Sequence, residues 1–448
     1  MASQSVATVI LAAGKGTRMR SDVHKVLHPI AGKPMVGHLM DATAELEPTF
    51  EIMVVGAGRD QLQAAFPKLS LVTQDPQLGT GHAVGFARDA LQGFSGAVLI
   101  LYGDTPFVPA ATMRAMVDAL ADADIVVLGF TPQDPGRYGR LILGEDGALT
   151  RIVEFKDATD AERAVTLCNS GVMAVRGDKL FQDLDQITNE NAAREYYLTD
   201  LVSIVRARGG RAAVVHAEEN DVLGVNSREE LAKAEAIFQM RRRGEAMAQG
   251  VTLISPETVF FSHDTRLGRD VTIEPNVVFG PGVTVEDYAQ IRAFSHLEGA
   301  HVGRSAIVGP YARLRPGTVL GERVKVGNFV ETKKAKVADG AKINHLSYVG
   351  DASVGPRANI GAGTITCNYD GFFKYETVIG ADAFIGSNTA LIAPVRVGEG
   401  AIVGAGSAIS KDVVDGALAI TRSAQTAKPG WAARFREIMR ARKEKKSA

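Results

Sequence analysis

The stretch VGRSAIVGPYARLRPGTVLGERVKVG, residues 302–327, carries an aliphatic residue at every sixth position. The same period extends in both directions through the second half of the chain. Its positions are Leu253, Val259, Thr265, Val271, Val277, Val283 and Ala289, then Val302, Val308, Leu314, Leu320 and Val326, then Ile379, Ile385, Leu391, Val397, Val403 and Ile409. Three hexads of this kind make one triangular coil, and successive coils stack. The sequence therefore predicts a left-handed parallel β-helix, with a C-terminal tail, over residues 251–448.

Glycines directly follow many positions of this repeat. They are Gly303, Gly309, Gly327, Gly350, Gly355, Gly361, Gly380, Gly386, Gly398 and Gly404. Because glycine adopts backbone angles that other residues avoid, we expect these glycines at turns with unusual backbone angles. The period breaks over AGTITCNYDGFFKYET, residues 362–377, which we expect to form a loop extruded from the coil.

The first 226 residues alternate short apolar runs with amphipathic stretches. Continuous apolar runs predict strands buried on both faces of a sheet. They lie at 6–13, 51–58, 97–104 and 124–130. The pattern predicts an α/β, Rossmann-like domain with a mostly parallel sheet over residues 1–226.

Amphipathic segments between the apolar runs predict helices. One is expected at 34–46, with Pro34 at its first helical position, and another at 110–123. Residues 227–250 are charged, rich in alanine and free of proline, with acidic residues early and arginines late. This charge order complements a helix dipole, so the segment predicts a linker helix between the two halves.

Composition restricts the kind of protein. Lys and Arg number 50 against 51 Asp and Glu, a net charge of -1, so we expect no nucleic-acid partner. The two cysteines, Cys168 and Cys367, match neither a disulfide framework nor a zinc-ligand spacing. The apolar run at 6–13 is too short to span a membrane, and no Lys or Arg precedes it. We expect a cytoplasmic protein without membrane insertion.

A glycine-rich turn, LAAGKGTRM at residues 11–19, ends the first predicted strand. It lacks the third glycine of a dinucleotide fingerprint and the Gly-Lys-Ser/Thr of a Walker A loop. Backbone amides of such a turn can approach a triphosphate, and Arg18 and Lys25 can offset the charge of two anions. A glycine-rich turn alone is as often structural. The two cations favour a phosphate site, with Arg18 and Lys25 as catalytic candidates.

Asp104 ends the strand predicted at 97–104. This is the carboxyl edge of the sheet, where ligands of open α/β folds bind. Mg²⁺ needs few protein oxygens beside waters and substrate phosphates, so a carboxylate here can hold it. An Asp at the end of a strand is also a common turn residue, so this position alone leaves both interpretations open.

Further motifs, together with these, resemble those of the sugar-1-phosphate nucleotidylyltransferases. They are QLGTGHA at 77–83, LYGDTP at 101–106, YGR at 138–140, VEFKDA at 153–158, NSG at 169–171 and GVNSR at 224–228. The solenoid adds RPG at 315–317, ETKKA at 331–335, NHLSYVGD at 344–351 and NIGAGTITCNYDG at 359–371. In this order, over essentially the whole chain, they resemble the bacterial family of bifunctional N-acetylglucosamine-1-phosphate uridylyltransferases and glucosamine-1-phosphate acetyltransferases.

The resemblance implies two reactions, with UTP and acetyl-CoA as co-substrates and Mg²⁺ as cofactor. Glucosamine-1-phosphate is acetylated, and the product is coupled to UTP, giving UDP-N-acetylglucosamine for cell-wall precursors. Asp104 and Asn226 are implied as the Mg²⁺ ligands. Contacts to UDP-N-acetylglucosamine are implied for Leu11, Ala12, Ala13, Gly14, Lys25, Gln74, Gly79, Thr80, Tyr102, Gly103, Gly139, Glu154, Asn169 and Asn226.

In the second half, acetyl transfer requires a base that takes a proton from the sugar amine, and the resemblance implies His345. A lone histidine on a solenoid is otherwise an incidental surface residue. Sugar-phosphate contacts are implied for Arg315, Lys333, Tyr348 and Asn359. Acetyl-CoA contacts are implied for Ala362, Asn368, Tyr369, Ser387, Ala405 and Arg422. For Ala362 and Ala405, a small side chain is equally what any solenoid requires.

Two other interpretations remain open at this stage. The solenoid could serve only regulation or assembly, as in the glucose-1-phosphate adenylyltransferases, but the histidine motif and the region of Lys333 argue against a passive role. A non-enzymatic scaffold has no use for Arg18, Lys25 and Asp104 around a glycine-rich turn. The resemblance further implies a homotrimer that acts on small-molecule substrates.

Overall fold

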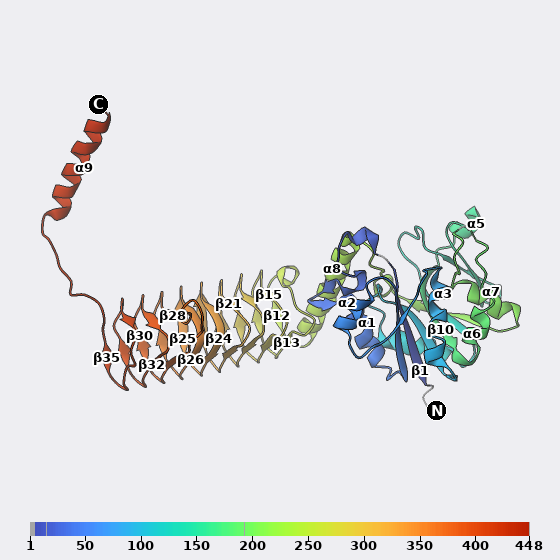
Figure 1. Cartoon of the computed structure of the whole chain (residues 1–448), viewed down its shortest axis with the longest axis horizontal. Coiled ribbons are helices and arrows are strands. Elements are labelled where there is room, and N and C mark those ends of the chain that lie inside the picture. Colours follow the sequence, from blue (N-terminus) through green and yellow to red (C-terminus); the bar gives the residue numbers. More distant parts are fainter. Residues whose placement is uncertain (1–4, 15, 192, 448) are drawn as a thin grey trace. The chain divides into compact units, whose positions relative to one another are not determined.

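The computed structural model of the chain describes residues 5–14, 16–191 and 193–447. It divides into two compact units, Met1–Arg242 and Arg243–Ala448. The division falls inside helix α8 (Arg228–Ala248), in the segment for which the sequence predicts a helix. Figure 1 shows the elements of both units, which are described separately below.

The first unit is built on a nine-stranded sheet. Its strands are β1 (Val6–Ala12), β4 (Phe50–Val55), β5 (Ser70–Thr73), β6 (Ala97–Tyr102), β7 (Ile125–Phe130), β8 (Arg140–Leu143), β9 (Leu149–Val153), β10 (Cys168–Arg176) and β11 (Ala212–Ala217). The main path runs β11-β7-β10-β6-β1-β4-β5, and β8 and β9 form an antiparallel pair that joins β10. Neighbours on this path are parallel except at β10, which is antiparallel to β6 and β7. The mostly parallel sheet and the four predicted strands are confirmed.

Helices pack on both faces of this sheet. The helices are α1 (Met35–Ala44), α2 (Arg59–Ala65), α3 (Thr80–Gly85), α4 (Ala110–Ala119), α5 (Asp160–Arg163), α6 (Gly177–Leu184) and α7 (Asp200–Ala207), with 3-10 turns η1 (Thr17–Met19), η2 (Lys25–Leu27), η3 (Asp89–Leu91) and η4 (Glu219–Asp221). Ile10 and Ala12 of β1 belong to the core formed with α1 and α4, whereas Val9 and Leu11 belong to the core formed with α3, α6 and α7. Because both faces are covered, every residue of β1 is buried, and all of them except Thr8 are apolar.

The predicted start of α1 is off by one residue. Pro34 is the N-cap of α1 and not its first helical residue, because it ends the short strand β3 (Lys33–Pro34) and pairs with Pro29 of β2 (Pro29–Ile30). The predicted helix at 110–123 is confirmed as α4, which ends earlier, at Ala119.

The second unit is a left-handed parallel β-helix followed by a helix, α9 (Trp431–Ser447) (Figure 1). A 3-10 turn, η5 (Pro256–Thr258), lies in its first coil. One ten-stranded sheet contains β12 (Thr252–Leu253), β14 (Thr272–Ile273), β17 (Gln290–Ile291), β20 (Ile307–Val308), β23 (Lys325–Asn328), β25 (Lys342–His345), β27 (Asn359–Ile360), β30 (Phe384–Ile385), β33 (Ile402–Val403) and β35 (Leu418–Ala419). All of its neighbours pair in parallel, as a coil requires.

A fourteen-stranded sheet contains the other strands of the coils. They are β13 (Arg266–Leu267), β15 (Val278–Phe279), β16 (Thr284–Val285), β18 (His296–Leu297), β19 (Ala300–Val302), β21 (Arg313–Leu314), β22 (Thr318–Leu320), β24 (Glu331–Val337), β26 (Tyr348–Val354), β28 (Ile365–Cys367), β29 (Thr377–Ile379), β31 (Ala390–Ile392), β32 (Val395–Val397) and β34 (Ala408–Ile409). The predicted loop is shorter than expected, because Ile365 continues the coil opposite Tyr348 and only residues 368–376 leave it.

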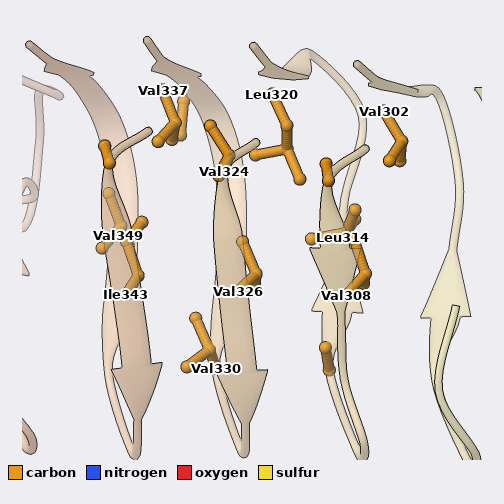
Figure 2. Packing of buried hydrophobic residues seen from close by; sticks show 14 of the residues in the cluster. Val302, Val308, Leu314, Leu320, Val324, Val326, Val330, Val337, Ile343 and Val349 are labelled. Atoms are coloured by element: carbon orange, nitrogen blue, oxygen red, sulfur yellow. The ribbon is translucent and has the colours of Figure 1, made fainter. Parts of the chain in front are cut away.

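Each hexad contributes two inward side chains, where the sequence count assumed one. Val324 and Val326 are both buried, as Figure 2 shows, and Lys325 between them is exposed. The series that begins at Val302 is in register with Val285 and not with Val283, so the six-residue count passes from one inward row to the other. Two aliphatic rows per face fill the prism, and each buried side chain of this size contributes about 1.5–3 kcal/mol.

The glycines of the repeat have a different role from the predicted one. Of the ten glycines named above, only Gly309 has a positive φ, 95°. A Cβ on Gly327 would lie 2.0 Å from the carbonyl oxygen of Asn344, and one on Gly355 would lie 2.5 Å from the backbone of the next coil. These glycines therefore allow coils to approach closely, whereas left-handed corners are often occupied by other residues, such as Phe294 and Phe329.

Candidate active sites

A pocket of about 320 Å³ lies beyond the carboxyl ends of β1, β5 and β6. Parallel strands end at the same edge of a sheet, so residues far apart in the sequence meet there. The predicted residues that line it are Leu11, Ala12, Ala13, Gly14, Lys25, Gln74, Gly79, Thr80, Tyr102 and Asp104. Val26, Gln77, Ala83 and Glu195 complete the lining.

Lys25, Asp104 and Asn226 form a polar cluster at this pocket. The Lys25 ammonium forms an ion pair with the Asp104 carboxylate and lies 3.1 Å from Oδ1 of Asn226. The side chains of Lys25 and Asp104 are only 11% and 18% exposed. The backbone amide of Val225 donates to the Asp104 carbonyl at 2.9 Å, and the amide of Asn226 donates to Glu230 at 2.7 Å. These bonds hold the three side chains together although 201 positions separate Lys25 from Asn226.

The donor set of this cluster fits Mg²⁺. A carboxylate oxygen of Asp104 and an amide oxygen of Asn226 converge on one cation, the Lys25 ammonium. Mg²⁺ takes such hard oxygen ligands and completes its shell with waters and substrate phosphates. Within the described ranges no group of three or more His, Cys, Asp or Glu is arranged to hold a metal.

The opposite wall of the pocket is formed by Gln74 and the start of α3. Nε2 of Gln74 donates to the carbonyl of Gly79 at 3.0 Å. Gly79 has φ 118°, and a Cβ there would lie 2.6 Å from the carbonyl oxygen of Tyr196, so only glycine fits. The hydroxyl of Thr80 accepts from the amide of Leu198 at 3.1 Å.

Gly139, directly before β8, Glu154, directly after β9, and Asn169 in β10 lie together, outside the pocket lining. The amide of Asn169 donates to the Gly139 carbonyl at 2.8 Å, and the Thr199 hydroxyl donates to Glu154 at 3.4 Å. Burial raises the pKa of the Glu154 carboxyl, which the hydrogen bond from Thr199 opposes. This group is a second polar wall beside the pocket.

Tyr102 connects these two regions. Burial raises the pKa of its hydroxyl well above the usual range, and the carboxylates of Asp104 and Glu154 both add to the shift. The phenol therefore stays neutral and can donate a hydrogen bond. A Cβ on Gly171, whose φ is 92°, would lie 2.7 Å from the Tyr102 ring, so the glycine of the NSG motif makes room for this ring.

Two other predicted residues have different surroundings. The amide of Gly103 donates to the Leu11 carbonyl at 2.9 Å, so Gly103 fixes the two strand ends that carry Leu11 and Asp104. Arg18 is exposed in η1 and does not line the pocket.

On the β-helix, His345 is exposed at the end of β25. Its Nδ1 lies 2.6 Å from Oδ1 of Asn328, the residue that faces it in β23 of the preceding coil. An amide oxygen can only accept, so Nδ1 carries the hydrogen and Nε2 retains its lone pair. This is the state that a general base requires.

Arg315 and Lys333 face each other in consecutive coils. The amide of Arg315 donates to the Thr332 carbonyl at 2.9 Å, and the Arg315 guanidinium is 2.9 Å from Glu331. A contact with Lys374 is the main cause that lowers the pKa of Lys333, since two ammonium groups repel each other. Three cations thus gather on one face of the prism.

Tyr348 reaches the same face. Gly350 is the residue opposite Lys333 in the next coil, and a Cβ on Gly350 would lie 2.3 Å from the Tyr348 hydroxyl. The absence of a side chain at Gly350 therefore allows the hydroxyl to lie beside Lys333. Asn359 stands one coil above Lys342, three residues before Ala362.

Three of the predicted acetyl-CoA residues, Ala362, Ser387 and Ala405, lie in line with His345 in successive coils of the prism. Backbone bonds join each coil to the next: Gly363 to the His345 carbonyl at 3.2 Å, Asn388 to the Ala362 carbonyl at 2.7 Å, and Gly406 to the Ser387 carbonyl at 2.8 Å. The Arg422 guanidinium donates to the carbonyl of Ala405, where the row ends. The row is therefore His345, Ala362, Ser387 and Ala405, with small side chains beyond the histidine.

Asn368 and Tyr369 begin the extruded loop. The Asn368 amide donates to the Asp351 carboxylate. Tyr369 is exposed and forms an antiparallel bridge with Lys374, so the loop turns back and carries Lys374 toward Lys333.

Comparison with known proteins identifies the family to which the chain belongs. Residues 8–218 match the MobA-like NTP transferase domain, and residues 264–299 and 376–411 match the bacterial transferase hexapeptide (six repeats). Bifunctional protein GlmU of Sphingopyxis alaskensis is 62% identical over 442 residues, 98% of each chain. That of Paramagnetospirillum magneticum is 54% identical over the full length of both chains. The chain belongs to the bifunctional GlmU family.

Membership in the GlmU family decides between the interpretations that the sequence left open. The chain is a bifunctional enzyme, a uridylyltransferase and a glucosamine-1-phosphate acetyltransferase, and neither a scaffold nor a nucleotidylyltransferase with a passive solenoid. Over the described residues, no helix combines the length and the apolar character that crossing a bilayer demands.

Some residues of this GlmU family member were missed by sequence reasoning. Asn328 stands 17 positions before His345, one coil length, and this spacing is the signal that identifies it. Lys374 lies in the predicted loop, where nothing in the sequence points toward Lys333. Gln77, which donates to the Ala13 carbonyl, is the first residue of the quoted QLGTGHA motif, but Glu195 carries no motif.

Proposed function

We propose that the pocket at the sheet edge binds UTP beside N-acetylglucosamine-1-phosphate. The glycine-rich turn and Lys25 would receive the triphosphate, and Gln74, Gly79 and Thr80 the uracil. The sugar would lie toward Tyr102, Glu154 and Asn169, the second polar wall. The observation that carries this proposal is the meeting of Lys25 with Asp104 and Asn226, because it joins a cation to two metal-binding oxygens at the pocket.

In the uridylyl step, an oxygen of the sugar phosphate attacks the α-phosphorus of UTP, a new P–O bond forms, and pyrophosphate leaves. Such a displacement needs alignment and charge neutralisation more than covalent chemistry. Lys25 supplies a positive charge between the two anions. Asp104 and Asn226 would hold Mg²⁺, which when bound neutralises phosphate charge. The neutral Tyr102 hydroxyl can donate to the sugar. Arg18, exposed at the turn, keeps a proposed role in charge neutralisation.

In the acetyl step, Nε2 of His345 takes a proton from the sugar amine as the nitrogen attacks the thioester carbonyl. The C–N bond forms, the C–S bond breaks, and the leaving sulfur takes up the proton from Nε2, so that coenzyme A leaves as the thiol and the ring is again neutral. Asn328 supports this role because it fixes the ring with Nε2 free to accept. Arg315, Lys333 and Lys374 would hold the sugar phosphate, and a dianion there relieves the repulsion between the two lysines.

Acetyl-CoA would lie along the row of small side chains. Its thioester end would reach His345, and its chain would pass Ala362, Ser387 and Ala405, with Arg422 at the end of the row. Asn359 would contact the sugar, and Asn368 and Tyr369 the coenzyme from the loop. The coil-to-coil register, which aligns His345, Ala362, Ser387 and Ala405 along the prism, supports this path, on which the reacting carbonyl would lie beside the base.

The chain is further proposed to be a cytoplasmic homotrimer, with a uridylyltransferase domain at 1–226, a linker helix at 227–250 and an acetyltransferase domain at 251–448. A column of exposed aromatic residues supports assembly. Phe294, Tyr311 and Phe329 stack in successive coils at 4.9 and 5.2 Å and are 51%, 47% and 55% exposed. Sedimentation at several concentrations tests this; a monomer throughout contradicts it.

One experiment tests both site assignments. The enzyme is incubated with glucosamine-1-phosphate, acetyl-CoA, UTP and Mg²⁺, and each component is then omitted in turn. Without acetyl-CoA no N-acetylated product forms; without UTP or Mg²⁺, N-acetylglucosamine-1-phosphate accumulates. Formation of a UDP sugar from the unacetylated phosphate at an equal rate would contradict the proposed order.

A further inference from the structure

His82 lies between the nucleotide pocket and a second cavity. It belongs to α3, whose Thr80 and Ala83 line the nucleotide pocket. His82 itself lines a separate cavity of about 410 Å³ with Arg88 and Tyr196. Its Nδ1 lies 3.2 Å from Nε2 of Gln74, and His82 is not among the residues that line the nucleotide pocket. The uridylyl mechanism above makes no use of His82.

The two contacts of Gln74 determine which way its amide points. Gln74 is 5% exposed, and its Nε2 donates to the Gly79 carbonyl at 3.0 Å. A carbonyl can only accept, so the nitrogen end of the amide faces Gly79. The second hydrogen on Nε2 meets Nδ1 of His82, which must then be the unprotonated ring nitrogen. Both hydrogens are used, so Gln74 presents only Oε1 to other partners.

This orientation matters for reading a pyrimidine. N3 carries a hydrogen in uracil and a lone pair in cytosine. An oxygen that can only accept attracts the first and repels the second. If the amide rotates by 180°, the NH₂ group faces the base and this preference is reversed. Gln74 therefore distinguishes the two bases only while its nitrogen is held by its two partners, the Gly79 carbonyl and Nδ1 of His82.

We infer that His82 is a positioning residue that sets the selectivity for uracil over cytosine, by holding the Gln74 amide with its oxygen toward the base. The inference rests on the proposed placement of uracil at Gln74. It extends that placement because His82 acts through Gln74 and does not touch the nucleotide.

The His82 ring is itself held in place. It stacks on Tyr196, with centroids 6.1 Å apart, and meets the edge of Phe86 at 5.0 Å. Two backbone hydrogen bonds fix Tyr196. Its amide donates to the Leu78 carbonyl at 2.8 Å, and its carbonyl accepts from the Gly81 amide at 2.9 Å. Because the His82 ring is fixed by these contacts, its Nδ1 stays in one position and can hold the Gln74 amide in one orientation.

The test compares kcat/KM for UTP and CTP in the full-length enzyme with saturating N-acetylglucosamine-1-phosphate. His82→Phe keeps an aromatic ring but removes the acceptor. His82→Asn keeps an acceptor oxygen near the position of Nδ1. Phe86→Leu loosens the same ring contact and leaves both atoms of the hydrogen bond. We expect the UTP/CTP ratio to fall about tenfold in His82→Phe, the value of one neutral hydrogen bond, and to be largely retained in the other two variants.

The ratio is independent of the fraction of enzyme that is folded, since inactive chains lower both values equally. If the unsubstituted enzyme uses UTP normally and His82→Phe leaves the UTP/CTP ratio unchanged, the inference about His82 is wrong but the proposed function stands. Equal loss of the ratio in His82→Asn and His82→Phe also overturns it. In a Gln74→Leu background His82→Phe should have no further effect. Failure of the unsubstituted enzyme to use UTP would instead refute the proposed function on which the inference rests.

Discussion

Oδ1 of Asn328 lies 2.6 Å from Nδ1 of His345, across one coil of the β-helix. The two residues face each other in β23 and β25, so the register of the coils, and not a local turn, creates the contact. An amide oxygen at this distance holds the ring in one tautomer, with Nε2 exposed as the acceptor. The solenoid thereby orients the ring of an exposed histidine, as the proposed general base requires.

Replacing Asn328 tests this orientation. We expect Asn328→Ala to lower kcat for acetyl transfer about tenfold, since the tautomer and the ring rotation are no longer fixed. His345→Ala should cost about 10²- to 10⁴-fold, the usual contribution of a general base. Acetylation is measured as the release of the coenzyme A thiol. Uridylyl transfer by the same samples is the control, and an equal loss of both activities would refute two independent sites.

The β-helix was predictable from the sequence because each coil repeats one requirement, an aliphatic residue that points into the prism. Each hexad has two inward residues, such as Val324 and Val326. The second was missed because one aliphatic residue per hexad already produces the six-residue period. The role of Gly327 was misread because its close neighbour, the Asn344 carbonyl, belongs to the next coil. Contacts between coils depend on register, which a count along the chain does not give.

The residues of the two candidate sites also fall into a group that the sequence predicted and a group that it missed. Lys25 and Asp104 were predicted separately, from a glycine-rich turn and a strand end, and the parallel sheet brings them together at one edge. Lys374 was not predicted, because its approach to Lys333 depends on the path of an extruded loop. Sequence motifs identify residues that lie at the carboxyl ends of parallel strands, because these ends meet at one edge of the sheet. A partner one coil away, such as Asn328, can be found from the coil length, but a partner supplied by a loop, such as Lys374, depends on the path of that loop.

Removing the Asp104 carboxylate should affect only the uridylyl reaction. In Asp104→Ala, Lys25 loses its ion pair and Asn226 remains as a single oxygen ligand, so we expect a loss of about 10²-fold or more in kcat. Pyrophosphate release is measured over a Mg²⁺ titration, with acetyl transfer as the control. Unchanged uridylyl transfer at saturating Mg²⁺ would exclude Asp104 from the metal site.

The row of small side chains can be blocked by a larger one. Ala405→Leu fills the proposed path of the coenzyme at an exposed position, and we expect the KM for acetyl-CoA to rise about tenfold with a smaller change in kcat. Ala408→Leu is the matched control, because Ala408 is also exposed but lies in β34 of the fourteen-stranded sheet, outside the row. If both variants raise this KM alike, the coenzyme does not follow the row.

Glu154 gives a prediction about pH. Burial raises the pKa of its carboxyl above the value in the unfolded chain, so between these two values the folded protein binds more protons. Stability therefore falls as the pH rises through this window, and the ionised carboxylate destabilises the fold above it. We expect Glu154→Gln to raise the unfolding midpoint at neutral pH, and the gain over the unsubstituted protein to disappear in acid.

A carboxylate with the opposite shift is the control. Glu162 accepts from the backbone amide and the hydroxyl of Thr159, and these bonds lower its pKa. Its stabilisation is present above the unfolded pKa and is lost as the pH falls through the folded pKa. Glu162→Ala should therefore lower the midpoint at neutral pH, with a difference that also vanishes in acid. Thermal melts must begin well below the unfolded glutamate pKa of about 4.3, because the Glu162 window lies beneath it, and must extend to about pH 8 for Glu154. If Glu154→Gln shifts the midpoint in the same direction as Glu162→Ala at neutral pH, burial of Glu154 does not destabilise the folded chain.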